Sequence, residues 1–145
     1  MTLYTGCIYD FATGRGIIGI SVMSRHTLSD GKALDKEIVK GINYDVHYPL
    51  LGPPGELIGV YYKTKNLDSK EERWRRYVEG FNQHMEEPEV KFLLEMIAKS
   101  SLEKDIAFLC VERGGAIKGR ELCCHRRLLA ERCQILVPEV KIVHL

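Results

Sequence analysis

The sequence has no long apolar run, no excess of one charge and no signal-peptide pattern at its start. The longest apolar runs are far shorter than the about 20 residues of a membrane-spanning helix, so we expect no membrane segment. Without an export signal, we expect a cytoplasmic protein. The net charge is +1, which gives no global attraction to nucleic acid, and only a local basic patch would support such binding.

The sequence has five cysteines, which is an odd number. An odd number without an export signal indicates thiols rather than a disulfide framework. Cys110, Cys123, Cys124 and His125 offer thiolate and imidazole ligands, but they lack the Cys-x-x-Cys spacing of zinc sites. Adjacent cysteines also rarely reach one ion. We therefore assign no metal and no other cofactor from the sequence.

The 145 residues are enough for one domain with a proper core, and 45% hydrophobic with 28% charged residues is typical of a soluble globular protein. Apolar runs predict strands at 3–9, 17–23, 106–111 and 141–145. Helical patterns alternate with them and follow Ser69, follow Pro88 and span 124–136. This alternation predicts an α/β fold: a single compact three-layer domain over residues 1–145, with a mostly parallel sheet, Rossmann-like. The uniformly apolar run 106–111 should be its central strand.

Residues 27–68 carry few helical cues, so we expect them to be mostly irregular and to overhang the carboxyl edge of the sheet. Pro53 and Pro54 lack a backbone donor and interrupt periodicity. Within this region, 34–41 is compatible with one or two helical turns and 45–51 with a strand or extended segment. Ser69 and Glu72 then have the spacing of a capping box, which opens the clearest helix.

Cys124 and His125 are the first candidate site residues, because they fall at the start of the helix predicted over 124–136. The backbone amides and positive dipole end at a helix start stabilise a thiolate, and Arg126 adds positive charge. His125 lies on the buried stripe of the helix, where a structural role and a catalytic role both remain open.

Glu112, Arg25 and His26 are the remaining candidates, because they follow predicted strands whose carboxyl ends meet at one sheet edge. Glu112 can act as an acid/base, hold His125 in one tautomer, or form a structural pair with Arg126. Arg25, His26 and Arg126 are candidate anion-binding residues, since arginine binds oxyanions through its planar fork.

These residues stand in segments that resemble the domain-of-unknown-function-488 (DUF488) family, its small stand-alone prokaryotic branch. The resemblance rests on Cys110-Val111-Glu112 and on Cys124-His125-Arg126, and it extends over nearly the whole chain through these further segments: 20–28, 30–31, 51–61 around Pro53-Pro54, and 88–90. It implies a compact α/β domain with shared polar residues in the Cys-x-Glu and Cys-His-Arg segments. Many relatives carry Asp-Val-Arg after the second strand, whereas this chain keeps Arg25 and lacks the aspartate. The resemblance implies no reaction.

Two functions remain open on the sequence. The first is an enzyme acting on a small anionic or nucleotide-like substrate, with Cys124, His125 and Glu112 as catalytic residues and Arg25, Arg126 and His26 binding the anion. The second is a non-catalytic anion- or nucleic-acid-binding regulatory module in which the cysteines only pack. A small anionic ligand is the expected partner in both cases, and a homo-oligomer stays open.

Overall fold

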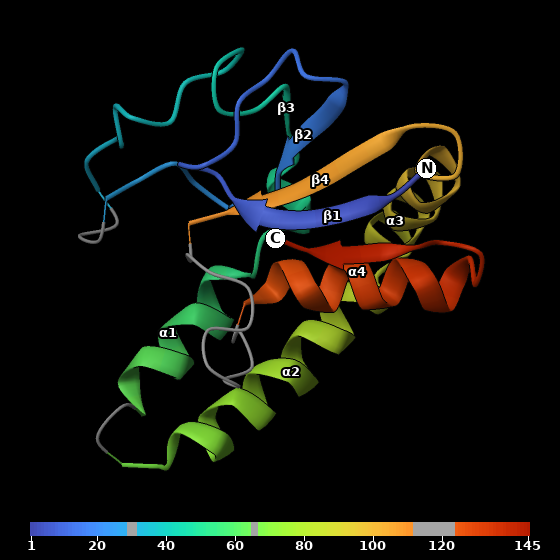
Figure 1. Ribbon diagram of the computed structural model, residues 1–145. Helices are drawn as coiled ribbons and strands as arrows, with labels where there is room; N and C mark the ends of the chain where they lie inside the picture. The colour runs from blue at the N-terminus through green and yellow to red at the C-terminus, as the bar shows by residue number, and fades with distance from the viewer. Residues whose placement is uncertain (29–31, 65–66, 112–123) are drawn as a thin grey trace.

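The computed structural model describes residues 1–28, 32–64, 67–111 and 124–145. In these residues a five-stranded sheet has the order β3-β2-β4-β1-β5, and every neighbouring pair of strands is parallel (Figure 1). The strands are β1 (Leu3–Cys7), β2 (Ile17–Ser21), β3 (Val46–His47), β4 (Asp105–Cys110) and β5 (Ile142–His144). The predicted α/β fold with a parallel sheet is confirmed.

The apolar strand β4 lies at the centre of this sheet, as its composition predicts, and all of its residues after Asp105 are buried. Its register with β1 runs from Ile106 opposite Leu3 to Cys110 opposite Cys7. On the other side Leu109 lies opposite Ser21, the last residue of β2. The carboxyl ends of the three strands therefore share one edge of the sheet, and Cys110 lies on that edge.

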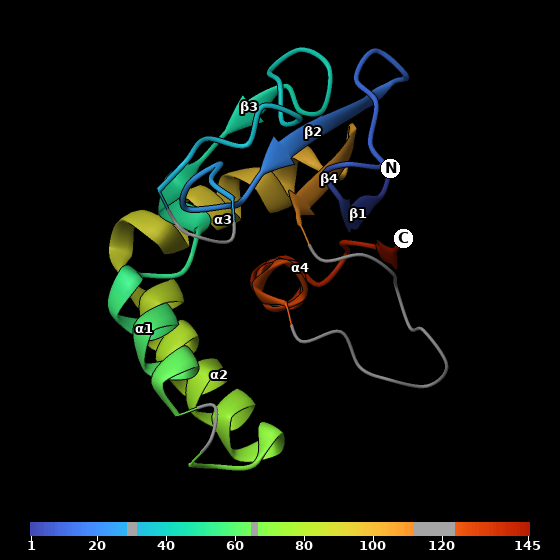
Figure 2. The same cartoon turned by 90° about the vertical axis from the view of Figure 1, so that its left-hand side faces the viewer.

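Four helices accompany the sheet in the described residues: α1 (Gly55–Lys63), α2 (Lys70–Glu86), α3 (Pro88–Ser100) and α4 (His125–Leu136). Helix α4 packs on β1, β4 and β5, while α3 packs on α4 and α2. Helices α1 and α2 pack on each other and extend away from the sheet (Figures 1 and 2). No helix in the described ranges is both long and apolar enough to cross a membrane.

The start of α2 shows the hydroxyl half of the predicted capping box, and α3 begins at Pro88 as expected. Ser69 is the N-cap of α2, and its hydroxyl accepts a hydrogen bond from the amide of Glu72 at 3.2 Å. The carboxylate of Glu72 pairs with Arg75 on the helix surface. Pro88 occupies the first turn of α3, where its missing donor costs no helical hydrogen bond. Both helices therefore begin where local sequence rules place them.

The prediction that residues 27–68 are mostly irregular is wrong at their C-terminal part, because α1 occupies Gly55–Lys63. The carbonyl of Pro54 accepts the first helical hydrogen bonds from Leu57 and Ile58 at 3.0 and 3.2 Å, so the proline pair introduces the helix. The ring of Tyr61 in α1 then lies 5.6 Å from that of Tyr77 in α2, and this packing stabilises the pair.

Residues 34–41 also differ from the expectation, since they form turns and isolated bridges instead of helical turns. The carbonyl of His26 accepts from the amide of Asp35 at 2.9 Å, which ties this segment to the chain that leaves β2. Residues 45–51 do form the short strand β3, followed by a single 3-10 turn at Pro49–Leu51. Irregular chain therefore dominates the described residues between β2 and β3, and backbone hydrogen bonds stabilise it there without a helix.

Candidate functional site

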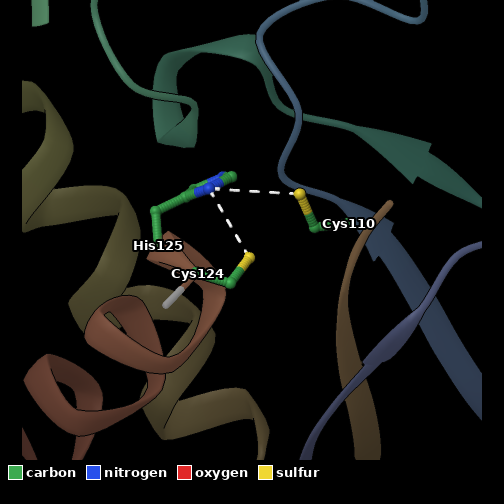
Figure 3. A group of neighbouring side chains, drawn as sticks. All are labelled: Cys110, Cys124 and His125. Atoms are coloured by element: carbon green, nitrogen blue, oxygen red, sulfur yellow. Dashed lines mark hydrogen bonds between the residues drawn. The ribbon is translucent and has the colours of Figure 1, made fainter. Parts of the chain in front are cut away.

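Three side chains with reactive atoms meet at the carboxyl edge of the sheet, and we name Cys110, Cys124 and His125 the Cys-His cluster (Figure 3). Cys110 ends β4, Cys124 is the N-cap of α4, and His125 is the first residue of that helix. Nδ1 of His125 lies 3.9 Å from Sγ of Cys124 and 4.0 Å from Sγ of Cys110. All three residues are buried, with exposed fractions of 2% for Cys124, 4% for Cys110 and 6% for His125.

The backbone of β2 fixes the orientation of the His125 ring. Nε2 of His125 lies 2.7 Å from the carbonyl oxygen of Val22, which directly follows β2. A carbonyl oxygen only accepts, so Nε2 carries a proton and donates. In the neutral ring Nδ1 therefore presents its lone pair to the two sulfurs. The edge of the Phe81 ring packs on the imidazole with 5.6 Å between ring centres, which restricts its rotation further.

Cys124 has the electrostatic setting of a thiolate. Its backbone is extended at φ −142° and ψ 138°, as is usual for an N-cap, so the residue lies at the positive end of α4. Burial raises the pKa of the Cys124 thiol. Hydrogen bonds from Cys110 and His125 and the positive charges of His125 and Arg126 act the other way and hold this pKa well below its ordinary value.

Cys133 provides an internal comparison, because it lies on the same helix and is fully buried. Its sulfur lies 3.6 Å from the carbonyl of Leu94, and burial raises the pKa of its thiol to about 12. The two cysteines thus share a helix and a buried state and differ in their polar neighbours. The polar neighbours of Cys124 are therefore the cause of its lowered pKa.

Arg126 lies beneath the cluster as a fully buried cation, with an exposed fraction of 0%. Its Nη1 donates to the carbonyl of Cys110 at 3.5 Å. The guanidinium therefore acts on the cluster through its charge from inside the protein and does not extend into solvent.

The structure places the other predicted site residues in different surroundings. Arg25 is exposed and follows the same edge of the sheet as Cys110. His26 belongs to a separate group, where Nε2 lies 2.7 Å from Oγ of Ser21 and the ring stacks on His47 at 4.1 Å. Burial and the charge of His47 lower the pKa of His26 to about 4. Glu112 lies outside the described residues. The structure thus joins Cys124, His125 and Arg126, while His26 contacts Ser21 and His47.

Two contributors to the site have no signal in the local sequence. The proximity of Cys110 to His125 follows from the placement of β4 against the start of α4, and the spacing of the two residues along the chain does not indicate it. The carbonyl of Val22 performs the orienting task for which the sequence offered Glu112, and a backbone atom leaves no trace in side-chain patterns.

The fold and the site define the class of protein, which is an α/β domain with a buried Cys-His cluster at the carboxyl edge of a parallel sheet. A family model described as the active DUF488-N3 subclade matches residues 25–134. The chain belongs to the DUF488 family, a family without an established function. Searches of curated proteins and of solved structures found no match.

Proposed function

We propose that this protein is an enzyme that acts on a small anionic or nucleotide-like substrate, with Cys124 as nucleophile and His125 as its proton partner. The observation that carries the proposal is the arrangement of the His125 ring. Its Nε2 is held by the Val22 carbonyl at 2.7 Å while its Nδ1 faces Sγ of Cys124 at 3.9 Å. A base that is oriented by a third group beside a thiol is the general signature of an activated nucleophile.

The chemistry follows from the proton on Cys124. Its transfer from Sγ to Nδ1 of His125 produces a thiolate and an imidazolium. The thiolate attacks an electrophilic carbon or phosphorus atom, and the imidazolium returns the proton to the leaving group. Water then releases the product from sulfur. Cys110 supports the thiolate with a hydrogen bond, and Glu112 remains our candidate for a second acid/base group. Thiol chemistry of this kind also favours a cytoplasmic location.

Preference for an anion follows from the fixed positive groups around Cys124. Cys124 lies at the first-turn amides of α4, and the charge of buried Arg126 acts on it. Exposed Arg25, at the same sheet edge, would bind the substrate from the solvent side. We leave His26 out of the binding set, since with a pKa of about 4 it is neutral at pH 7.

A non-catalytic anion- or nucleic-acid-binding module is the alternative, and the burial of Cys124 to 2% exposure favours it. Its nucleic-acid form has less support. Two exposed arginines of α2 form ion pairs within the chain, because Arg75 pairs with Glu79 at 2.7 Å and Arg76 pairs with Asp68 at 2.6 Å. Phosphate binding requires cations that are available to the backbone of the nucleic acid.

Two alkylating reagents of similar size test the proposal. Iodoacetate is anionic and iodoacetamide is neutral, and the modification of each cysteine is followed by fragment-ion mass spectrometry in chelator-treated protein. We expect the ratio of the iodoacetate rate to the iodoacetamide rate to be higher for Cys124 than for the free thiol glutathione. Cys133 should stay unmodified. A ratio equal to that of glutathione would reject the anion preference. Failure of both reagents to modify Cys124 would support the non-catalytic module.

A further inference from the structure

We propose that the Cys-His cluster is a binding site for a thiophilic divalent cation of the Zn²⁺ class. The ligand atoms are Sγ of Cys110, Sγ of Cys124 and Nδ1 of His125, which all lie within 4.8 Å of one another. The inference goes beyond the proposed function and does not rest on it, because a metal and a nucleophilic thiolate require the same lone pairs for different purposes.

The distances in the cluster suit tetrahedral coordination. With Zn–S near 2.3 Å and Zn–N near 2.1 Å, a tetrahedral ion separates a sulfur from a nitrogen ligand by about 3.6 Å. The two distances from Nδ1 of His125 are 3.9 Å to Cys124 and 4.0 Å to Cys110. Both sulfurs converge on that one nitrogen (Figure 3), so a contraction of a few tenths of an ångström brings each sulfur–nitrogen pair to the tetrahedral value. The two sulfurs lie within 4.8 Å of each other, and tetrahedral coordination at about 2.3 Å would bring them to about 3.8 Å.

The surroundings of His125 match those of a metal-binding histidine. Such a histidine donates its second ring N–H to a carbonyl or carboxylate, which fixes the tautomer and the direction of the ligand nitrogen. The carbonyl of Val22 fulfils this role at 2.7 Å from Nε2. Phe81 packs against the ring and limits its motion. The ligand nitrogen is thus directed towards the sulfurs before any ion arrives.

Charge and ligand type select the ion. Two thiolates balance one divalent cation, so the ion and its two sulfur ligands carry no net charge beside the buried Arg126, and this removes most of the cost of burying a lone ion. Thiolate and imidazole ligands favour Zn²⁺ over Mg²⁺ and Ca²⁺, which require oxygen. On binding, the thiol protons leave for solvent, and the three side chains leave one position of a tetrahedral ion for water or another ligand.

Cobalt(II) titration of the chelator-treated protein tests the site. We expect one equivalent of Co²⁺ to bind, with a sulfur-to-metal charge-transfer band of two-thiolate intensity that Zn²⁺ abolishes. Cys110→Ser should halve the intensity of the band. It should also weaken Co²⁺ binding by more than roughly 10- to 100-fold, which is the loss expected when only an outer-shell partner is removed. Cys133→Ala is the matched control on α4, and it should bind as the wild type does. Circular dichroism establishes that each variant is folded.

The outcomes separate the metal site from the proposed function. Absence of the band in the wild type, or an undiminished band in folded Cys110→Ser, overturns the metal site and leaves the nucleophile proposal standing. A two-thiolate band in a protein whose Cys124 resists both alkylating reagents supports the metal site and rejects the nucleophile. If the metal site and the nucleophile are both present, Zn²⁺ should prevent alkylation of Cys124 in the wild type. Alkylation that proceeds unchanged at one equivalent of Zn²⁺ would reject the metal site.

Discussion

Nε2 of His125 donates to the carbonyl oxygen of Val22 at 2.7 Å and so connects the start of α4 to the end of β2, although 103 residues separate the two in sequence. The bond leaves Nδ1 to face the sulfurs of Cys110 and Cys124. The reactivity of the cluster therefore depends on a contact between the two elements.

Replacement of His125 by glutamine should separate orientation from proton transfer. The amide of glutamine can donate to Val22 but offers no imidazole nitrogen to Cys124. We expect His125→Gln to remain folded, and we expect the alkylation of its Cys124 at neutral pH to be slower by at least about 100-fold. This is the lower end of the rate contribution of a general base. Site-resolved alkylation kinetics measures this, with Cys133→Ala as the control. An unchanged rate would show that His125 plays no part in activation.

Phe81 should couple the stability of α2 to the site, because it is fully buried, stacks on Tyr77 at 6.0 Å and packs against His125 at 5.6 Å. Phe81→Ala is expected to lower the free energy of unfolding by about 3–5 kcal/mol, as large-to-small core substitutions do. Phe81→Leu keeps more of the volume and should cost less. Urea denaturation measures both, and equal losses for the two variants would contradict the packing account.

The pH dependence of stability should carry a contribution from His26. Burial and the charge of His47 lower the pKa of His26 from 6.5 to about 4, while the charge of Asp35 acts in the opposite direction. The folded state thus resists a proton that the unfolded chain accepts, so stability is lost as the pH falls from about 6.5 towards about 4. His26→Gln, which can still bond to Ser21, should flatten this part of the profile. Urea midpoints measured across that range provide the test, and a profile as steep as that of the wild type would contradict it.

Metal binding should raise the thermal stability of the folded chain. An ion that binds only the native state stabilises it in proportion to the logarithm of its concentration over Kd, about 2.7 kcal/mol at one hundred times Kd. We expect Zn²⁺ to raise Tm in the wild type and in Cys133→Ala, and to raise it by less in Cys110→Ser. Scanning calorimetry in the presence of chelator or Zn²⁺ gives the comparison, and an equal rise in Cys110→Ser would place the ion elsewhere.

The sequence predicts those features that depend on local rules. The central position of β4 follows from its apolar residues, and the start of α4 at Cys124 and His125 follows from helical spacing. Likewise, Ser69 begins α2 because a hydroxyl at that position accepts an orphan amide. These features are set by neighbouring residues, so they can be inferred before the fold is known.

The remaining features depend on the three-dimensional arrangement and leave no local pattern. The approach of Cys110 to His125 and the bond to Val22 arise only when β2, β4 and α4 have taken their places. Helix α1 escapes prediction for a different reason, since Pro54 reads as a breaker unless its carbonyl is known to start a helix. The stacking of His26 on His47 likewise arises only when the chain that leaves β2 lies against β3.

The most direct test of the central claim compares the alkylation rate of Cys124 by iodoacetamide at pH 7 in the native protein and in the same chain unfolded in urea. The unfolded chain provides an ordinary thiol with the same local sequence. Because His125, Cys110 and Arg126 stabilise the thiolate only in the folded state, we expect a faster rate in the native protein for Cys124 and a slower one for Cys133. If Cys124 reacts more slowly in the native protein, as Cys133 should, it is a structural thiol and the claim that it is the nucleophile is contradicted.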